Sequence, residues 1–431
     1  MVNELIYQGG IAAKMRTRGE AGENLKVAGV IAEYNPFHNG HSFHLRETRS
    51  LTGAETVVAV MSGDFAQRGE AAFWDKWTRA RIAVENGADL VLELPFVYAC
   101  NNAEYFAKGA VRLLNRLGCV THLSFGSECG DLGRLSEAAE IIVREPEGFR
   151  ASLRAFSGKG CSFPKARCEA LRELAGTRSA DLLKQPNNIL AIEYLKQLIM
   201  TGSDIRPVTV RRRGAEYDGR NDEARVAGAS ALRKLFLAGK SKEALAYLPE
   251  TAARVLSLAE NRGLAASQSF YQMIAYALRT KEAKELGDIF SASEGLENRA
   301  KAAVERAVDM ESLVAAIKSK RYTETRIRRF LLHALFGLEK SSLRSIEESG
   351  AAYGRVLALN GRGARILRRI KNGGDPSFHV ITNLSKSRRA AEAVWPLLRY
   401  DILASDLYNL AKNGEMREDS DYRKKPFVKM D

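Results

Sequence analysis

Three histidines spaced three residues apart are the feature of this sequence best suited to chemistry. His38, His41 and His44 make up half of the chain's six histidines, and they follow an apolar, β-branched run, VAGVIA, that is typical of a buried strand. Histidines at this spacing can bind a metal ion, can stabilise the transition state of substitution at a phosphate, or can simply be satisfied locally. No carboxylate or cysteine is obviously placed to complete a metal site, so the cluster favours phosphate chemistry.

The segment that carries these histidines is predicted to be a strand, a tight turn and a helix. Pro36 ends the strand because proline cannot extend a ladder, and a polar run with helical character continues through Arg49. The start of a helix offers free backbone N–H groups and the positive end of its dipole, which can hold a polyphosphate. Gly40 would allow the backbone to approach such a ligand, and His38 and His41 can share one side of the first turn.

Strands and helices alternate along the first half of the chain, which predicts a parallel sheet with helices on both faces. The predicted strands are Val27–Ala32, Glu55–Met61, Leu90–Leu94, His122–Phe125 and Pro207–Val210, and the helices between them include Lys76–Glu85 and Tyr105–Leu117. Ligands of such sheets bind outside the carboxyl ends of the strands. The histidines should therefore lie at the same edge as the loops that follow the other strands, where Gly126 is a candidate for close approach to a ligand.

Composition limits the class of protein. With 431 residues, 45% hydrophobic and 27% charged, the chain should form a soluble protein of two or three domains. No apolar run approaches the length of a membrane span, and the N-terminus lacks an apolar signal core. Five cysteines without paired spacing indicate reduced thiols and a cytoplasmic location.

The net charge of +14 indicates a polyanionic partner, most simply nucleic acid, although a merely basic enzyme would have the same charge. We expect residues 1–24 to be a disordered extension and 25–240 to form an α/β domain with a helical insertion at about 131–200. Residues 241–431 should form a mainly α-helical basic domain, with a single brief strand at Phe378–Thr382.

The string EYNPFHNGH resembles the HxGH signature of the nucleotidylyltransferase superfamily, and in its longer form it is similar to one branch, the bacterial tRNA(Met) cytidine acetate ligases. The segments MSGDFAQRGEAA, DKW, GADLVLELP and FGSE fit the same family in order. GASALRKLF resembles the second superfamily signature, a serine at a helix start followed by a Leu-Arg step. The resemblance covers roughly residues 27 to 430 and is densest in the first half.

This resemblance implies a Rossmann-like nucleotidylyltransferase sheet followed by a mainly α-helical tRNA-binding domain. It implies that acetate attacks the α-phosphate of ATP, with Mg²⁺ on the phosphates, to give acetyl-adenylate. The N4 amine of the wobble cytidine in elongator tRNA(Met) then takes the acetyl group, giving N4-acetylcytidine. We predict no membrane association, no obligate protein partner and no metal held by protein side chains. The alternatives are adenylyl transfer to a small molecule, or a non-catalytic RNA-binding protein on the same fold.

The resemblance assigns some residues to roles, and the helix starts and basic clusters of the sequence predict others. His38, His41 and Arg233 are expected to be catalytic. Ser230 is expected to cap its helix, as is Asn187 or Asn188. The expected nucleotide-binding residues are Ile31, Glu33, Tyr34, Asn35, Pro36, Phe37, Asn39, Gly40, His44, Gly126, Asn187, Arg212 and Ser230. Arg212 is the closest match to a basic pair of the family within the run Arg211–Arg213. The expected RNA-binding residues are Arg68, Arg326, Arg328, Arg329, Arg368, Arg369, Lys424 and Lys425.

Overall fold

The computed structural model describes residues 25–212, 227–259, 267–350, 352–373, 375, 377–414 and 420–430. The predicted disordered extension, residues 1–24, and Arg213 lie outside these ranges. Among the residues that the structure describes, no helix is both long and apolar enough to cross a membrane.

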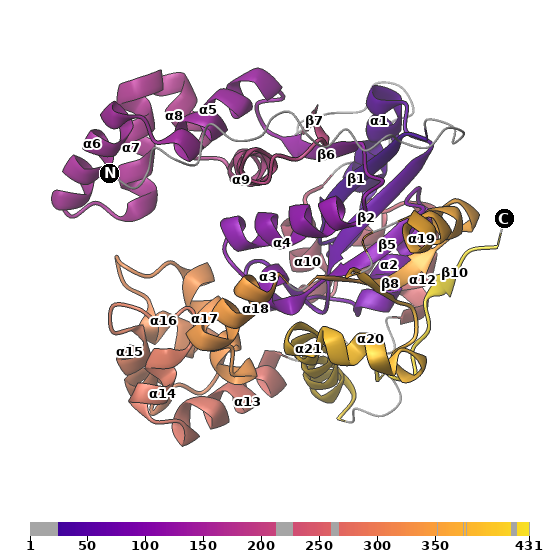
Figure 1. Cartoon of the computed structure of the whole chain (residues 1–431). Helices are drawn as coiled ribbons and strands as arrows, with labels where there is room; N and C mark the ends of the chain where they lie inside the picture. Colours follow the sequence, from indigo (N-terminus) through magenta and orange to yellow (C-terminus); the bar gives the residue numbers. More distant parts are fainter. Residues whose placement is uncertain are drawn as a thin grey trace.

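A parallel sheet forms the centre of the molecule (Figure 1). Its parallel strands are β1 (Val27–Ala32), β2 (Thr56–Ser62), β5 (Leu90–Leu94), β6 (His122–Ser127) and β7 (Arg206–Arg211), in the order β5-β2-β1-β6-β7. Each neighbouring pair in this order runs parallel. These strands confirm the predicted α/β class and agree with the predicted ranges to within two residues.

The strand order reverses beside β1. From β1 the chain builds outward through β2 and β5, and it then returns to add β6 and β7 on the other side. In an open α/β sheet the crevice at this reversal, outside the carboxyl ends of the two strands, is where ligands bind. The crevice therefore lies between the loop that follows β1, which carries the histidines, and the loop that follows β6, which begins near Gly126.

Alternate residues of β2 enter different apolar cores. Val58 and Val60 belong to the cluster that includes helices α4 (Ala103–Arg116) and α9 (Pro186–Met200), whereas Val57 and Ala59 belong to the cluster on the opposite face. The second cluster includes residues of α1 (Asn39–Thr52) and α2 (Lys76–Glu85), and α2 matches its predicted bounds. Burial on both faces explains the continuous apolar character of the strand.

A helical insertion between β6 and β7 confirms the helical prediction for residues 131–200. Its helices are α5 (Leu132–Arg144), α6 (Glu147–Gly158), α7 (Phe163–Ala175), α8 (Thr177–Leu182) and α9. Helix α9 packs against α4, α5 and β6, and thereby attaches the insertion to the sheet. The other helices of the insertion project to the upper left of Figure 1.

The C-terminal half adds three strands to the same sheet. Strand β8 (Tyr353–Leu359) runs antiparallel to β5, while β9 (His379–Ile381) and β10 (Phe427–Val428) run parallel to β8. The brief strand predicted at Phe378–Thr382 is confirmed as β9, but the prediction missed β8. All seven residues of β8 are buried, including Arg355, whose charge interrupts the apolar pattern that marks a buried strand. The domain boundary at residue 240 stays a prediction, and the sheet extends across it.

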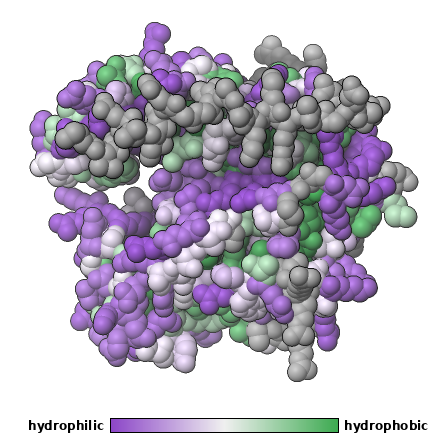
Figure 2. Space-filling view, in the orientation of Figure 1, coloured by the Kyte–Doolittle hydropathy of each residue, from purple (hydrophilic) through white to green (hydrophobic). Residues whose placement is uncertain are grey.

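Short elements and helices complete the described part of the chain. They are β3 (Phe65–Ala66), β4 (Glu70–Ala71), α3 (Phe96–Ala99), α10 (Ala229–Leu237), α11 (Ser241–Leu245), α12 (Glu250–Ala259), α13 (Ser267–Thr280), α14 (Ala283–Asp288), α15 (Leu296–Val304), α16 (Met310–Ile317), α17 (Glu324–Phe336), α18 (Lys340–Ser349), α19 (Gly361–Gly373), α20 (Arg388–Ala393) and α21 (Trp395–Asn413). A short 3₁₀ turn, Leu384–Lys386, precedes α20. Figure 2 shows a mainly hydrophilic face, with a narrow notch at the left between the insertion and the helices below it.

Candidate active site

The side chains of His38 and His41 cap the N-terminus of α1. His38 is the N-cap residue, and its Nδ1 accepts a hydrogen bond from the Gly40 backbone N–H at 3.1 Å. The Nδ1 of His41 accepts from the His38 backbone N–H at 3.2 Å, so the two residues make a capping box. Their rings stack with centroids 3.8 Å apart. This geometry confirms that both imidazoles share the first turn of the helix.

Both imidazoles are neutral donors at ordinary pH. Burial, and then the charge of Arg212, lowers the pKa of His38 to about 3. Burial also holds the pKa of His41 well below its ordinary value, with smaller contributions from the His38 and Arg212 charges. A neutral imidazole carries one N–H, and since Nδ1 accepts in both rings, the proton is assigned to Nε2. Each ring therefore keeps an Nε2–H that can donate to a phosphate oxygen.

The backbone N–H groups at the start of α1 are not free, which the sequence prediction did not anticipate. The N–H of Asn39 donates to the Tyr247 carbonyl at 3.1 Å, that of Gly40 donates to His38, and that of His41 donates to the His38 carbonyl at 2.8 Å. An anion at this edge consequently meets the imidazoles and nearby arginines, with the helix dipole as a weaker influence.

Aromatic packing holds the His41 ring. The ring centroid of Tyr34 lies 4.9 Å from that of His41, and the centroid of Phe37 lies 5.4 Å from it. Both aromatic side chains are almost fully buried, and Tyr34 has a positive φ of 48°. These two residues, predicted as nucleotide contacts, are placed to position the imidazole. His44 is engaged as well, because its Nε2 lies 3.1 Å from Ser124 Oγ on β6 and so joins α1 to the sheet.

The turn between β1 and α1 is tied to its surroundings by several hydrogen bonds. The Asn35 side chain accepts from the Phe73 N–H at 2.8 Å, and the Asn35 carbonyl accepts from Arg233 Nη1 at 2.9 Å. The Glu33 carboxylate accepts from the Gln67 N–H at 2.8 Å. Pro36 follows Asn35 through a cis peptide bond, and Ile31, near the end of β1, is half-buried.

Arg79, on α2, is a positioning residue that the sequence reasoning missed. It is 1% exposed, and its guanidinium donates to the carbonyls of Glu33 at 2.6 Å and Ser62 at 3.1 Å, and also to the carbonyl of Gly63. One side chain therefore joins the loops that follow β1 and β2. The local sequence does not indicate this role, because a buried arginine in an amphipathic helix has the same sequence pattern as an arginine exposed to solvent.

Arg212 places a positive charge beside the histidines. It directly follows β7, and its backbone N–H donates to the Ser127 carbonyl at 2.8 Å. A Cβ added at Gly126 would lie 3.2 Å from Arg212 Cγ, so the glycine leaves space for this side chain. Within the described ranges, no side chain or carbonyl pairs with the Arg212 guanidinium. The structure thus brings together His38, His41, Gly126 and Arg212, as predicted.

Two predicted helix caps are wrong. The N-cap residue of α10 is Gly228, and Ser230 lies inside the first turn, where its Oγ accepts from Arg233 Nη2 at 3.3 Å. The N-cap residue of α9 is Gln185.

The carboxylate of Glu128 accepts the hydrogen bonds of backbone N–H groups at the start of α9 instead. Its Oε1 accepts from the Asn187 backbone and side-chain N–H groups at 3.1 and 2.6 Å, and its Oε2 accepts from the Asn188 N–H at 2.7 Å. A cap supplied from 60 residues away leaves no local trace in the sequence.

The predicted RNA-binding residues fall in separate places. On α17, Arg326 pairs with Glu294 at 3.5 Å, Arg328 pairs with Glu324 at 2.9 Å, and Arg329 donates to the Gln67 carbonyl at 3.2 Å. Arg368 and Arg369 are exposed on α19. This helix begins beside Asp89, which directly precedes β5, and so starts at the edge of the sheet opposite to the histidines. Arg68 is exposed in the β3–β4 turn, and Lys424 and Lys425 precede β10.

Because these histidines are neutral in the folded protein, we expect mildly acidic pH to destabilise it. In the unfolded chain an imidazole gains its proton near pH 6.5, whereas the folded pKa values are about 3 for His38 and about 4 for His44. The unfolded state therefore binds more protons between about pH 6.5 and 4, and stability falls as the pH decreases through that interval. We expect thermal unfolding followed from pH 7.5 to 4 to show this decline, and His44→Gln to make it smaller. A melting temperature constant down to pH 4.5 would contradict the assignment.

The chain is similar to known proteins along most of its length. A family model described as HIGH Nucleotidyl Transferase matches residues 25–423. The tRNA(Met) cytidine acetate ligase of Clostridium perfringens (strain ATCC 13124) is 37% identical over 413 residues, covering 94% of this chain and 100% of that protein. The protein of the same name from Thermoanaerobacter sp. (strain X514) is 41% identical over 395 residues, covering 90% of this chain and 96% of that protein.

A solved structure extends the likeness to three dimensions. Thermotoga maritima TmcAL bound with alpha-thio ATP matches with a TM-score of 0.87 at 32% identity, covering 94% of this chain and 100% of that chain. The apo structure of the same protein gives a TM-score of 0.88. The predicted family is thereby confirmed: this chain is a member of the HIGH nucleotidyl transferase family and, within it, of the tRNA(Met) cytidine acetate ligases.

Proposed function

We propose that this protein activates acetate with ATP and transfers the acetyl group to N4 of the wobble cytidine in elongator tRNA(Met). The relatives carry the name of this activity, and one solved relative binds an ATP analogue. The observation that carries the proposal is the stacked pair of neutral imidazoles at the point where the strand order reverses, with Arg212 beside them and without a side-chain partner among the described residues.

In the first step a carboxylate oxygen of acetate attacks the α-phosphorus of ATP. The bond from that phosphorus to the bridging oxygen breaks, pyrophosphate leaves, and acetyl-adenylate forms. Such a substitution requires positioning and charge neutralisation more than a protein nucleophile. The Nε2–H groups of His38 and His41 donate to the α-phosphate, and Arg212 and Arg233 stabilise charge on the phosphates.

In the second step the N4 amine of cytidine attacks the acetyl carbonyl. The bond from that carbon to the phosphate oxygen breaks, AMP leaves, and N4 loses a proton. The base has to leave its stack for N4 to reach the adenylate. The proposed nucleotide contacts are Ile31, Glu33, Tyr34, Asn35, Pro36, Phe37, Asn39, Gly40, His44, Gly126, Asn187, Arg212 and Ser230. Asn187 requires a change of partner, because its side chain is bound to Glu128 in this structure.

Mg²⁺ belongs to the proposal as an ion that arrives on the phosphates of ATP. Within the described ranges, no three histidine, cysteine or acidic side chains lie close enough together to hold a metal ion. The nearby carboxylates of Glu33 and Glu128 already accept backbone N–H groups. A Mg²⁺ ion commonly keeps several waters and binds through substrate phosphates, so the described side chains do not have to supply a resident site.

Incubation with labelled acetate, ATP and bulk tRNA tests the proposal. We expect label in tRNA that depends on ATP, and mass spectrometry of the digested RNA should identify N4-acetylcytidine. Label in a small molecule without RNA would support adenylyl transfer to a small substrate instead. RNA binding without any turnover of ATP would support a non-catalytic protein. We also propose a cytoplasmic location, which five unpaired cysteines support.

A further inference from the structure

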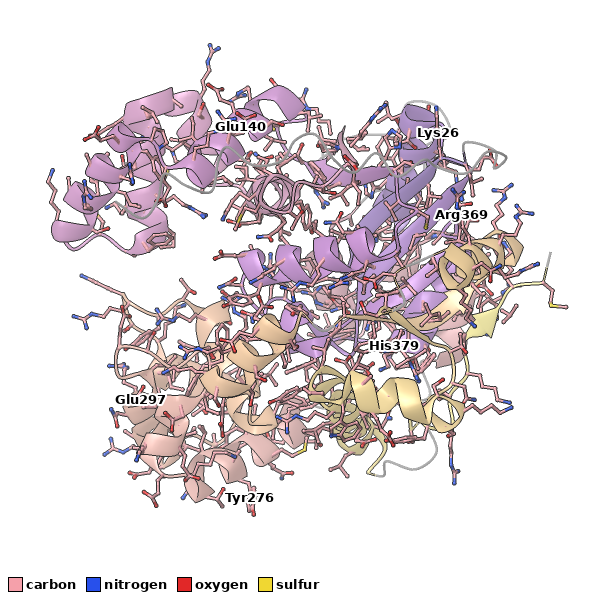
Figure 3. All side chains as sticks on the ribbon, in the orientation of Figure 1. Lys26, Glu140, Tyr276, Glu297, Arg369 and His379 are labelled. Atoms are coloured by element: carbon pink, nitrogen blue, oxygen red, sulfur yellow. The ribbon has the colours of Figure 1, made fainter. Side chains whose placement is uncertain are left out.

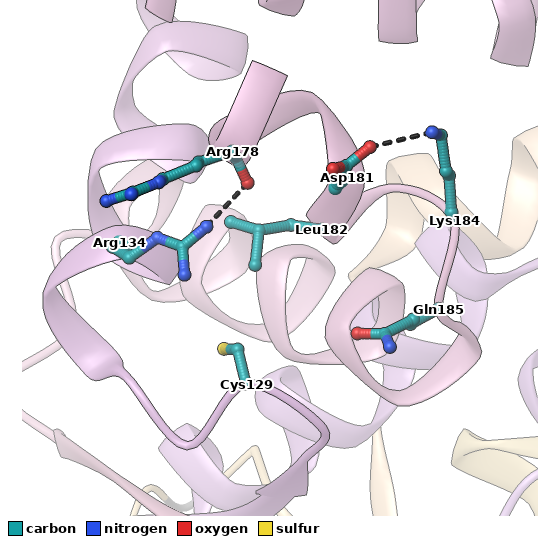
Figure 4. A pocket seen from close by; sticks show the side chains of 7 residues that line it. All are labelled: Cys129, Arg134, Arg178, Asp181, Leu182, Lys184 and Gln185. Atoms are coloured by element: carbon teal, nitrogen blue, oxygen red, sulfur yellow. Dashed lines mark hydrogen bonds and ion pairs between the residues drawn. The ribbon is translucent and has the colours of Figure 1, made fainter. Parts of the chain in front are cut away.

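A basic pocket opens beside the proposed active site, between the loop that follows β6 and the helical insertion. It has a volume of about 430 Å³ and is lined by Cys129, Arg134, Arg178, Asp181, Leu182, Lys184 and Gln185. Figure 4 shows these side chains grouped around the opening, with Cys129 and Leu182 pointing into it. This volume suits a large ligand group and greatly exceeds the size of an acetate ion.

The charges of this pocket favour a polyanion. It contains three cationic side chains and a single carboxylate, Asp181, which pairs with Lys184 at 2.7 Å. Arg134 Nη2 donates to the Arg178 carbonyl at 2.5 Å, which orients the guanidinium. The Arg178 side chain itself is exposed and makes no hydrogen bond or ion pair within the described ranges. The planar guanidinium of arginine matches a phosphate group and can bind it through two parallel hydrogen bonds.

The pocket is built on the loop that directly follows β6, at the catalytic edge of the sheet. Cys129 comes two residues after β6, and the N–H of the next residue, Gly130, donates to Ser127 Oγ at 3.0 Å. A Cβ added at Gly130 would lie 2.7 Å from Arg211 Cβ, so this arginine of β7 lies against the pocket loop. Since Arg212 follows directly, two adjacent arginines place positive charge against the pocket loop and beside the neutral histidine pair.

Other basic groups of the chain are less suited to hold RNA at this edge. All three arginines of α17 have partners in the described part of the chain, namely Glu294, Glu324 and the Gln67 carbonyl, whereas in the pocket Lys184 is paired with Asp181 but the Arg178 side chain has no such partner. Arg369 on α19 lies across the molecule from Glu140 on α5 (Figure 3). The nucleotide undergoing acetylation must reach the adenylate, so its neighbouring phosphates need cations close to the histidines.

We propose that this pocket binds backbone phosphates of the RNA substrate next to the nucleotide being acetylated, an inference that rests on the proposed function. Arg178 and Lys184 hold the phosphates, and Arg134 fixes the loop conformation that presents Arg178. The RNA backbone thus crosses the β6–α5 loop on its way to the histidine pair.

Charge-neutralising variants test this assignment in the full-length protein. Arg178→Gln with Lys184→Gln is expected to weaken binding of bulk tRNA about tenfold, and to reduce the slope of log affinity against log salt by about 1.5. Both side chains are exposed, so the melting temperature should not change. The matched control is Arg144→Gln with Arg154→Gln, which removes two exposed charges from the same helical insertion but outside the pocket lining, and should leave affinity and slope near the native values. Equal losses in the two double variants, or none in the first, would overturn the proposal.

Native thiols provide a second test without any mutation. Cys129 lines the pocket, whereas Cys119 precedes β6 at the opposite edge, near Arg369. Saturating tRNA is expected to slow alkylation of Cys129 by iodoacetamide at least fivefold, as followed by peptide mass spectrometry, and to leave Cys119 unaffected. Without tRNA, Cys119 will react more slowly than Cys129, because burial raises the pKa of the Cys119 thiol to about 11. Protection of Cys119 alone would place the RNA at the α19 edge and overturn the proposal.

The experiments distinguish a wrong pocket assignment from a wrong proposed function. If the native protein acetylates tRNA while the pocket variant keeps native affinity and salt slope, the pocket assignment is wrong and the proposed function stands. If the native protein neither transfers acetyl groups nor protects Cys129, the proposed function is wrong as well.

Discussion

Replacing His38 with asparagine is expected to slow acetyl-adenylate formation about 100- to 1,000-fold with little effect on stability. The loss of rate follows from removing one Nε2–H donor from the α-phosphate, and removing a single preorganised donor has an effect of this size in other enzymes. Stability is preserved because asparagine is among the best N-cap residues and can accept the Gly40 N–H in place of His38 Nδ1. Exchange of labelled pyrophosphate into ATP, dependent on acetate, measures the rate, and thermal unfolding measures the fold.

Comparison with two further variants separates the two roles of this residue. His38→Ala removes the donor and the cap together, so it should be as slow as His38→Asn and also less stable by about 1 kcal/mol. His122→Asn is the matched control, because His122 begins β6 at the opposite edge of the sheet and should exchange at the native rate. A His38→Asn protein that exchanges pyrophosphate at close to the native rate would show that the imidazole is only a helix cap.

The strands and helices that position this site were predictable because their signals are local. The apolar run of β1, the proline that follows it and the amphipathic pattern of α2 each depend on a few adjacent residues, and α2 was predicted to the residue. Parallel pairing then follows from the alternation of strands and helices. Together these features place the loops after β1 and β6 at one edge, and so bring His38 close to Gly126.

The caps and buried charges were not predictable, since their causes lie far away in the sequence. Glu128 satisfies the start of α9 from 60 residues away, and the side chain of Arg79 finds its carbonyl partners on two other loops. Arg355 illustrates the same limit. Strand β8 was not predicted because this charged residue interrupts its apolar run. In the structure the guanidinium is buried, and its Nη2 donates to the Asp421 carbonyl at 3.0 Å. An isolated charged residue in a sequence is expected to be exposed to solvent, because the distant group that pairs with it in the fold cannot be identified from the local pattern.

Replacing Lys76 with methionine is expected to destabilise the protein by about 3–5 kcal/mol, the usual cost of breaking a buried ion pair from one side. Lys76 is fully buried, and its Nζ lies 2.8 Å from Glu93 Oε1 on β5 and 2.8 Å from Asp421 Oδ2 near β10. Burial alone would lower the pKa of Lys76, but the surrounding carboxylates, Asp421 before Glu93, raise it above its usual value. Methionine fits a similar volume but removes the ammonium group that donates hydrogen bonds to both buried carboxylates. Urea unfolding monitored by circular dichroism measures the loss.

The size of this effect depends on burial, which a second substitution on the same helix can establish. Arg81 also lies on α2 and pairs with Glu85 at 3.0 Å, but its side chain is 45% exposed, so Arg81→Met should cost less than about 1 kcal/mol. Adding Glu93→Gln and Asp421→Asn to Lys76→Met removes the stranded charges and should restore part of the stability. Because Asp421 belongs to the C-terminal segment and Glu93 to the central sheet, recovery in this triple variant would show that Lys76 holds the two halves of the chain together by neutralising charge. If Lys76→Met cost no more than Arg81→Met, the network would have no such role.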